Sequence, residues 1–406
     1  MKKIIGVIGV GYVGMPLINE LAKSTLVIAY DIDEDKIYKL SLENKEKNIK
    51  FTSEESELKK CDVIIVAVPT PTINNMPDLS CVENACVTVG RNIKNGALII
   101  FESSYMPGTT QKICIPLIEK NSNKTHNKDF FVGYSPERIN PGDRIHTLNT
   151  ITKIVSADNN KTLKKVIDIY SLIENIKLKP VNDMKIAELS KMVENTQRDI
   201  NIAFINEIAK LCHKIGVDTN DVIEAATTKW NFYKVTPGFV GGHCIGVDPY
   251  YLIDIAEQNG VSLDVTKNAR KTNENMSNFI VDSLLSLLPK EIKNINIGIL
   301  GYSYKANSDD IRNTKTNDLI KELKKITPNV KISDYIVSKK INTLCNDKLN
   351  NLDVLIVTVD HDLYKNYTLE QLRSFFNENS KIKILMDLKS IYNKYNFDND
   401  IIYWKL

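Results

Sequence analysis

Continuous apolar runs and polar segments alternate along the first third of the chain. The runs at 3–8, 26–30, 62–68, 97–101 and 130–134 each fit one strand that is buried on both faces. Segments with helical periodicity or polar composition separate them, which is the order of a parallel α/β sheet. Because such sheets bind ligands beyond the carboxyl ends of their strands, we expect ligand contacts in the residues that follow each run.

The first strand leads into a glycine turn, Gly9-Val10-Gly11-Tyr12-Val13-Gly14, and residues 15–23 then have helical periodicity. The first glycine allows a tight turn, the second lets the backbone approach a pyrophosphate, and the third lets helix and strand pack closely. Asp31 ends the second strand, where a carboxylate bonds ribose hydroxyls and repels a 2'-phosphate. The pattern therefore predicts a site for NAD rather than NADP.

Polar side chains follow the later strands of the predicted sheet. Thr70 comes after the third strand, Ser104 after the fourth, and Glu137 and Arg138 after the fifth. Each is an ordinary turn residue when taken alone, but together they have the composition of a cofactor and substrate cleft. Lys36 has two interpretations, since it either reaches the adenosine part of the cofactor or is a solvated lysine in the first turn of a helix.

A run of helix-forming residues without Pro or Gly extends from about 183 to 215, which is long for a globular helix. Lys191, Asn195 and Arg198 stand at i, i+4 and i+7 and share one face. Each alone is expected to be solvated, but the three together can hold negative charge that develops on an oxygen. The other faces can bury against helices or a second subunit through Ile186, Leu189, Ile202, Phe204, Ile205 and Ile208.

Two further helices are expected, at 218–228 and 264–288, before a third region whose apolar runs echo those of the first. We predict an α/β fold in which two Rossmann-like, doubly wound domains are joined by a helical region with one long helix. The expected domains are a NAD-binding domain, a central helical domain and a C-terminal domain, at 1–182, 183–290 and 291–406.

The first turn of the third region, residues 302–305, lacks the glycines of a dinucleotide turn. A second dinucleotide is therefore not expected to bind there in the same way. Lys305, Arg312 and Lys389 fall at strand ends or turns of this region, where cations can hold phosphates, although none of them is diagnostic.

Length and charge narrow the classes of partner. The 406 residues are too many for one ordinary core. The charge of +3 is the small difference between 53 basic and 50 acidic residues, so small molecules are expected rather than nucleic acid or a membrane surface. Seven cysteines show no metal-binding spacing, and no signal-peptide pattern precedes the first strand. We expect reduced thiols, no metal site and a cytoplasmic location.

The stretch from Gly241 to Tyr251 brings a thiol and a carboxylate close together, because Cys244 and Asp248 are four residues apart behind two glycines. A cysteine there is a covalent nucleophile if a neighbouring charge or dipole makes it a thiolate, and the aspartate can then activate water. The alternative is a buried free cysteine in a loop.

Four segments closely resemble the UDP-glucose/UDP-N-acetylhexosamine 6-dehydrogenase family: Gly9 to Gly14, Ser135 to Asp143, Glu194 to Asp199 and Gly241 to Tyr251. Residues 305–312 resemble the third-domain motif of the family, so the resemblance covers nearly the whole chain. Val247 stands where the UDP-glucose branch usually has a lysine, which is similar to the branch that acts on N-acetylated sugars. The SPERINPGD, KWNF and DIRNT segments are most similar to the UDP-N-acetylglucosamine enzymes that serve Vi-type capsular polysaccharides.

The resemblance implies roles for the candidate residues. Cys244 is implied as the nucleophile, Lys191 and Asn195 as stabilisers of oxyanions, and Asp248 as the residue that manages the hydrolytic water. Ser104 is implied beside the chemistry, where the family often has threonine. The implied NAD ligands are Gly9, Gly11, Tyr12, Val13, Gly14, Asp31, Lys36, Thr70, Ser104 and Arg312. The implied substrate ligands are Glu137, Arg138, Ile139, Lys191, Asn195, Arg198, Gly241, Tyr304, Lys305 and Lys389.

The implied activity is a four-electron oxidation of the carbon-6 alcohol of a UDP-N-acetylhexosamine to the uronic acid, for surface polysaccharide biosynthesis. UDP-GlcNAc is the first expectation and UDP-GalNAc the next, with UDP-ManNAc or UDP-glucose as alternatives. More remote alternatives are a two-electron hydroxyacid-type NAD dehydrogenase and a non-catalytic NAD-binding protein. The resemblance also implies a homodimer through the long central helix.

Overall fold

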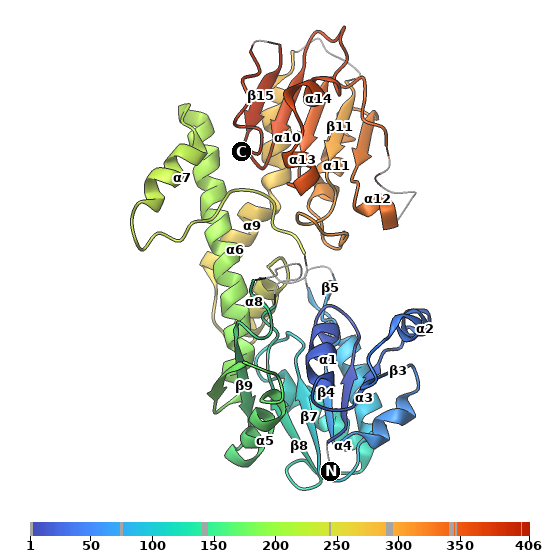
Figure 1. Ribbon diagram of the computed structural model, residues 1–406. Coiled ribbons are helices and arrows are strands. Elements are labelled where there is room, and N and C mark those ends of the chain that lie inside the picture. The colour runs from blue at the N-terminus through green and yellow to red at the C-terminus, as the bar shows by residue number, and fades with distance from the viewer. Residues whose placement is uncertain are drawn as a thin grey trace. The chain divides into compact units, whose positions relative to one another are not determined.

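The computed structural model divides the chain into two compact units, each described by itself below (Figure 1). Unit 1 comprises Met1–Glu194 and Tyr250–Val261, and unit 2 comprises Asn195–Pro249 and Ser262–Leu406. The residues that the structure describes are 3–73, 76–139, 145–242, 245–289, 295–340, 345, 347–398 and 400–406.

Unit 1 contains an eight-stranded sheet with the strand order β10-β9-β8-β7-β4-β1-β2-β3. Every neighbouring pair is parallel except β8 and β9, which are antiparallel. The central strands are buried on both faces, which explains their unbroken apolar sequence. The strands are β1 Ile5–Ile8, β2 Val27–Tyr30, β3 Ile49–Thr52, β4 Val63–Val66, β7 Ala97–Phe101, β8 Phe130–Tyr134, β9 Thr152–Ala157 and β10 Lys177–Val181.

Helices cover this sheet through apolar faces. In α1, Leu17, Ile18 and Leu21 are fully buried and join the core cluster that contains Val7 of β1. The helices and short elements are α1 Gly14–Ala22, α2 Glu34–Glu43, α3 Ser80–Asn92, α4 Ile115–Ser122, α5 Asn160–Tyr170, η1 Glu55–Lys60, η2 Thr110–Cys114 and the pair β5 Thr72–Ile73 with β6 Met76–Pro77. The long helix α6 spans Met184–Ile215 and passes from unit 1 into unit 2, whereas α8, Asp248–Gln258, begins in unit 2 and passes into unit 1.

Unit 2 contains a parallel five-stranded sheet with the order β12-β11-β13-β14-β15. One face packs on α10 and α11 and the other on α13 and α14, so this sheet is also doubly wound. The strands are β11 Ile297–Leu300, β12 Val330–Ser333, β13 Val354–Val357, β14 Ile384–Asp387 and β15 Ile402–Lys405. The helices are α7 Thr219–Thr227, α9 Asp264–Glu274, α10 Met276–Leu287, α11 Thr316–Leu323, α12 Val337–Lys340, α13 Asp362–Lys365 and α14 Leu369–Arg373.

The predicted fold class is confirmed by these two sheets and by α6, which is 32 residues long. The single helix predicted for 264–288 is wrong, because the chain breaks it at Asn275 into α9 and α10. Asn275 has φ −83° and ψ 1°, in the bridge region, and its side-chain oxygen accepts from Asn278. Asparagine side chains bond nearby polar groups in this way, which competes with regular helix.

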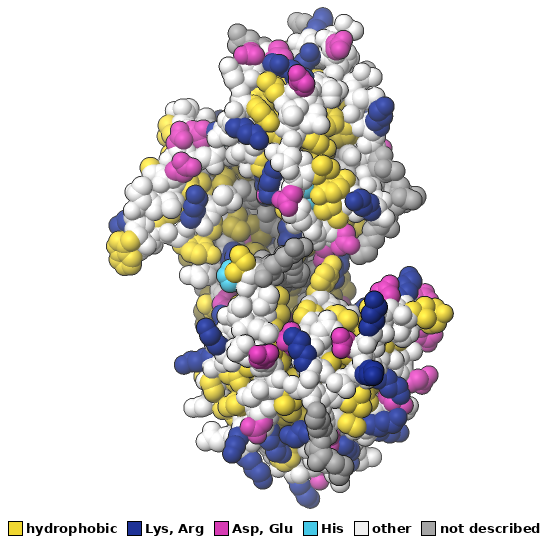
Figure 2. All heavy atoms as spheres, in the orientation of Figure 1, with side chains coloured by type: hydrophobic (Ala, Val, Ile, Leu, Met, Phe, Trp, Pro, Cys, Tyr) yellow, Lys and Arg dark blue, Asp and Glu magenta, His cyan; other side chains and the backbone are white. Residues whose placement is uncertain are grey.

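The surface agrees with the near-neutral charge. Figure 2 shows Lys and Arg side chains together with Asp and Glu side chains over the face of the molecule that it displays. Every helix in the described part of the chain is either too short or too polar to cross a membrane.

Candidate active site

The glycine turn after β1 has the geometry that a dinucleotide requires. Gly9 has φ +96°, and a Cβ added there would lie 2.5 Å from the carbonyl oxygen of Ala67. A Cβ on Gly14 would lie 1.9 Å from the carbonyl oxygen of Gly9, so strand and helix meet without room for a side chain. A Cβ on Gly11 would meet nothing within 4 Å, which leaves the backbone open to a ligand at the start of α1.

Asp31 lies beside this turn at the end of β2. Its Oδ2 accepts from the backbone N–H of Val10 at 2.8 Å and from Lys36 Nζ at 2.7 Å. Although burial acts in the opposite direction, these hydrogen bonds hold the pKa of Asp31 below its usual value. The carboxylate therefore stays charged, which the predicted contact with ribose hydroxyls requires. Lys36 forms an ion pair with Asp31, so it lies beside the carboxylate that is expected to bind the ribose.

The next candidates follow neighbouring strands of the same sheet. Thr70 follows β4 and Ser104 follows β7, and both side chains are partly exposed. The hydroxyl of Tyr251 donates to the Thr70 carbonyl at 3.3 Å, and Ser103 donates to Val68 at 2.7 Å, so both strand ends are fixed. Since β1, β4 and β7 are adjacent, the glycine turn and these two hydroxyls share one edge of the sheet.

Glu137 and Arg138 extend this edge beyond β8. Glu137 is buried, and its Oε1 accepts from the backbone N–H groups of Arg138 at 2.6 Å and Ile139 at 2.5 Å. Arg138 forms an ion pair with Glu194 at 2.8 Å and donates to the Thr152 carbonyl at 2.7 Å. Glu137 and Arg138 therefore both fix the conformation of the loop after β8.

Lys191 in α6 is only 7% exposed. No ion pair joins its side chain to a carboxylate in the described part of the chain. One turn earlier, Glu188 accepts from Thr110 Oγ1 at 2.6 Å and from the backbone N–H groups of Thr110 and Gly108. Burial raises the pKa of Glu188 to about 7 in spite of these three donors. Glu188 thus ties α6 to the loop after Ser104, a role that the sequence analysis missed.

Unit 2 brings together Asn195 and Asp248. The side-chain amide of Asn195 donates to Asp248 Oδ2 at 2.5 Å, and Asp248 is 2% exposed as the first residue of α8. The predicted nucleophile Cys244 lies outside the described residues, as does His243. The carboxylate four residues after the thiol is therefore buried and bonded to the asparagine that the sequence analysis assigned to the same chemistry.

The glycines before Cys244 pack closely on the first turn of the C-terminal sheet. A Cβ on Gly241 would lie 2.6 Å from the carbonyl oxygen of Asn313. Gly242 has φ +82°, and a Cβ there would lie 2.8 Å from the ring of Tyr304. Only glycine allows this approach, so the sequence Gly-Gly before the cysteine is explained by packing as well as by conformation.

The cationic site candidates of unit 2 do not all lie beside this glycine loop. Lys305 Nζ lies 5.6 Å from the centroid of the Tyr304 ring. Lys389 follows β14, and its Nζ would be 3.4 Å from a Cβ on Gly238. Arg312 forms an ion pair with Asp310 at 2.6 Å, and Arg198 is exposed on α6.

Three successive parts of the chain match one protein family. The matches are to the NAD binding domain, the central domain and the UDP binding domain of the UDP-glucose/GDP-mannose dehydrogenase family, at residues 39–174, 185–275 and 298–394. The chain belongs to this family. This enzyme therefore uses NAD, as the glycine turn and Asp31 predict, and is a nucleotide-sugar dehydrogenase.

Individual relatives match over almost their whole length. Protein CapL of Staphylococcus aureus is 40% identical over 100% of both chains. A UDP-N-acetyl-D-glucosamine 6-dehydrogenase of Salmonella typhi is 38% identical over 95% of this chain and 96% of its own. Among solved structures, UDP-D-ManNAc dehydrogenase of Pyrococcus horikoshii has a TM-score of 0.86 and 29% identity, with 99% and 98% of the two chains covered.

A second residue that the sequence analysis missed in this dehydrogenase is Asn206. Its side chain is fully buried in α6, accepts from the Gly238 N–H at 2.8 Å and donates to the Gly238 carbonyl at 3.0 Å. The same amide donates to Asn273, which in turn donates to Asp199. Asn206 therefore anchors the start of the glycine loop. Nothing in the sequence separates Asn206 from the other polar residues of the long helix.

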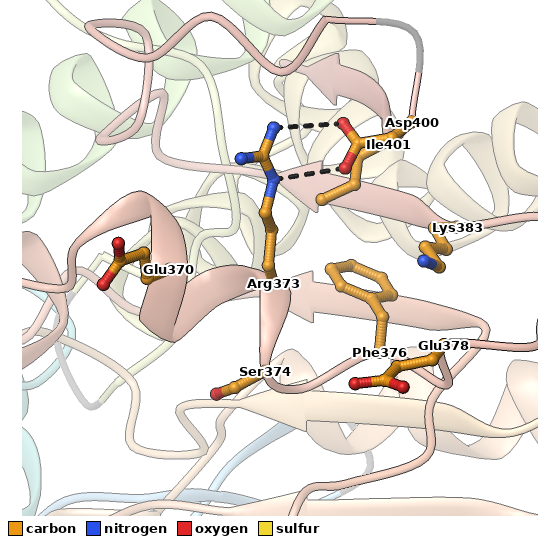
Figure 3. A pocket seen from close by; sticks show the side chains of 8 residues that line it. All are labelled: Glu370, Arg373, Ser374, Phe376, Glu378, Lys383, Asp400 and Ile401. Atoms are coloured by element: carbon orange, nitrogen blue, oxygen red, sulfur yellow. Dashed lines mark hydrogen bonds and ion pairs between the residues drawn. The ribbon is translucent and has the colours of Figure 1, made fainter.

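A pocket of about 220 Å³ lies in unit 2, beside α14 and the residues that precede β15 (Figure 3). No predicted site residue lines it. It lies around Arg373, which forms an ion pair with Asp400 at 3.1 Å and another with Asp398. Its arginine is thus already neutralised. The lining residues are Glu370, Arg373, Ser374, Phe376, Glu378, Lys383, Asp400 and Ile401.

Proposed function

We propose that this enzyme oxidises the carbon-6 alcohol of a UDP-N-acetylhexosamine to the uronic acid, with UDP-GlcNAc as the first candidate and UDP-GalNAc as the next. The observation that carries the four-electron chemistry is the hydrogen bond from Asn195 to the buried Asp248, which stands four residues after a cysteine in the sequence. The choice of sugar rests on relatives named UDP-N-acetyl-D-glucosamine 6-dehydrogenase at 38% and 36% identity, against 32% for the first UDP-N-acetyl-D-mannosamine dehydrogenase.

The proposed reaction has two oxidations and one hydrolysis. Each oxidation transfers one hydride from carbon 6 of the sugar to NAD. In the first, the alcohol proton goes to Lys191 in its neutral amine form or to a water held by Asp248. The Cys244 thiol then adds to the aldehyde, and its proton passes to the former carbonyl oxygen, which gives a thiohemiacetal. The second hydride leaves a thioester. Water activated by Asp248 adds to its carbonyl, the carbon–sulfur bond breaks, and the carboxylate and the free thiol are released.

Lys191 and Asn195 are proposed to hold the negative oxygen of both tetrahedral species. Such donors typically contribute about 3 kcal/mol each to the transition state. The burial of Lys191 strengthens this effect, since a charge in a site with little water is less screened. The hydrogen bond from Asn195 also orients Asp248 toward its role with water.

The remaining residues are proposed as ligands. For NAD these are Gly9, Gly11, Tyr12, Val13, Gly14, Asp31, Lys36, Thr70, Ser104 and Arg312. For the UDP-sugar they are Glu137, Arg138, Ile139, Arg198, Gly241, Tyr304, Lys305 and Lys389. The three functional domains are proposed at 1–182, 183–290 and 291–406. A homodimer through α6, a cytoplasmic location and a role in surface polysaccharide synthesis complete the proposal.

A substrate panel tests it directly. The purified enzyme is given UDP-GlcNAc, UDP-GalNAc, UDP-ManNAc and UDP-glucose, and NADH is counted for each sugar consumed. We expect UDP-GlcNAc to have the highest kcat/KM and to yield two NADH. One NADH for each sugar would indicate the two-electron dehydrogenase, and NAD binding without turnover would indicate a non-catalytic protein.

The thiol is tested with Cys244→Ser, for which buried Cys212→Ser is the matched control. Cys244→Ser should abolish carboxylate formation and leave NAD affinity unchanged, whereas Cys212→Ser should remain active. Release of two NADH by the Cys244 variant would show that catalysis is not covalent.

A further inference from the structure

Three ionisable side chains and a tyrosine form a buried cluster under the loop that carries Glu137. Lys153 of β9 is 2% exposed and lies between two carboxylates, with Nζ 3.2 Å from Glu102 Oε1 and 3.3 Å from Glu137 Oε2. The hydroxyl of Tyr170, from α5, donates to Glu102 Oε1. The Lys153 Nζ also lies 5.1 Å from the centroid of the Tyr170 ring. Three side chains, those of Glu102, Glu137 and Tyr170, thus surround the ammonium group of Lys153.

The strand order explains how they meet. Glu102 follows β7 and Glu137 follows β8, while Lys153 stands in β9, and these three strands are neighbours. Burying an ammonium group is strongly unfavourable unless it is paired, whereas an apolar side chain would fill the same place without losing hydration. A role beyond packing is therefore indicated for Lys153.

We infer that Lys153, with Glu102 and Tyr170, is a positioning residue that fixes the orientation and the negative charge of Glu137 for the sugar. The inference rests on the proposed function, in which Glu137 faces the substrate. Both oxygens of Glu137 are then occupied, since Oε1 accepts from the N–H groups of Arg138 and Ile139 and Oε2 is paired with Lys153. This double attachment also sets the direction in which the loop presents Arg138.

The two carboxyl groups of the cluster differ in pKa. Burial, together with the charge of Glu137, raises the pKa of Glu102 to about 7, although Lys153 acts in the opposite direction. The Oε2 atom of Glu102 is buried without a hydrogen-bond partner among the described residues, so it can carry the proton. Burial also disfavours the charged form of Glu137, but Lys153 and the two backbone donors outweigh it and lower its pKa. Glu137 is thus the ionised member, and Glu102 carries a proton below about pH 7 and loses it above.

The test compares kcat/KM for UDP-GlcNAc from pH 5.5 to 9.5 in the wild type, Lys153→Met, Lys153→Arg and Glu102→Gln. Lys153→Met leaves two buried carboxylates without their cation, which raises the pKa of Glu137. We expect kcat/KM to fall about tenfold or more at pH 7 and to recover as the pH rises. Lys153→Arg should restore most of the activity. The exposed Lys161→Met, in the first turn of α5, is the matched control and should behave as the wild type.

Glu102→Gln keeps the shape of the cluster and is the second variant. In the wild type, ionised Glu102 competes with Glu137 for Lys153, which gives a change in kcat/KM near pH 7, and Glu102→Gln should remove that change. This outcome decides the matter if Lys153→Met loses NAD binding and so is misfolded. A loss in Lys153→Met that is the same at every pH, or a change near pH 7 that persists in Glu102→Gln, would overturn the inference. A wild type that oxidises no UDP-sugar would instead overturn the proposed function, and this inference with it.

Discussion

At the scale of single residues, Asp248 has two candidate roles. It activates the water that hydrolyses the thioester, and it is also a candidate to hold the water that accepts the first proton. It is buried and hydrogen-bonded to Asn195, and the first proton acceptor is either a water held by Asp248 or Lys191. Asp248→Asn keeps the size of the side chain and removes the base. Hydrolysis of the thioester then slows by about 10²-fold or more, since general bases contribute that much.

The pre-steady-state burst of NADH distinguishes the two bases. If Lys191 accepts the first proton, Asp248→Asn should release two NADH for each active site rapidly and then stall as the thioester. Asp254→Asn, in the same helix, is the control and should turn over continuously. A variant with no burst would assign the first proton to the water held by Asp248.

Gly242 shows how one residue couples backbone conformation to packing. It has φ +82°, and a Cβ there would lie 2.8 Å from the ring of Tyr304, which is proposed to face the substrate. Gly242→Ala should therefore raise KM for the UDP-sugar about tenfold and leave the affinity for NAD unchanged. Gly260→Ala is the matched control, because Gly260 has φ +73° with nothing within 4 Å of the added Cβ. It should share the backbone strain, of about 1 kcal/mol, without the change in KM. Equal KM values for the two variants would contradict a role for the Tyr304 contact.

At the scale of elements, α6 carries an exposed apolar stripe. Ile186, Val193, Phe204, Leu211 and Ile215 are each at least half exposed. Their spacings of 7, 11, 7 and 4 residues place them within about 40° of one another on a helix of 3.6 residues per turn. Apolar side chains aligned in this way are typical of helices that pair with a partner.

The stripe predicts the oligomeric state. Phe204→Glu combined with Leu211→Glu should convert a dimer into a monomer, as light scattering after size-exclusion chromatography would show. Each buried side chain of this size contributes about 1.5–3 kcal/mol to association. Lys214→Glu, which is exposed but off the stripe, should remain a dimer. A wild-type protein that is monomeric at every concentration would contradict the homodimer.

At the scale of the whole molecule, each unit has its own hydrophobic core and its own measurable signal of folding. The core cluster of unit 1 contains β1 and β2, and the clusters of unit 2 contain β11 and β13. Both tryptophans, Trp230 and Trp404, belong to unit 2, whereas all the proposed NAD ligands except Arg312 belong to unit 1, so NAD binding reports mainly on unit 1. The stability of the two units can therefore be followed separately in the full chain.

The stability of unit 2 is expected to depend on pH through Asp334, which is fully buried. Its Oδ2 lies 3.0 Å from His361 Nε2 and accepts from the N–H of Tyr302 at 2.7 Å. Burial alone would raise the pKa of Asp334, but His361 and the backbone donors lower it to about 2. Since this value is below that of an unfolded aspartate, about 3.9, the pair stabilises unit 2 above pH 4, and this contribution is lost as the pH falls from 4 to 2.

Asp334→Asn should lower the free energy of unfolding of unit 2 at pH 7 by about 2–3 kcal/mol. Urea unfolding followed by tryptophan fluorescence measures the loss, and NAD affinity should stay unchanged. The difference from the wild type should shrink as the pH falls toward 2. Asp282→Asn, exposed in the middle of α10, is the control and should change neither value. A constant difference over this range would show that the carboxylate charge does not matter.

Local patterns determined the elements of this protein. The apolar runs predicted the central strands, and the absence of Pro and Gly predicted α6 almost to its ends. The glycine turn and Asp31 specified NAD because their contacts depend on backbone conformation within one βαβ segment. The break at Asn275 was missed because asparagine is compatible with a helix until its surroundings favour another conformation.

Only the tertiary structure decided which distant side chains meet. Nothing in the sequence singles out Lys153, yet the order β7-β8-β9 places it between Glu102 and Glu137. Asn206 and Glu188 likewise read as ordinary polar residues of a long helix, and they anchor loops that are far away in the sequence. The physical reason is that burial and charge pairing depend on strand order and helix packing, which hydrophobic periodicity leaves open. The sequence determined the elements and the cofactor, and packing determined which charges support the site.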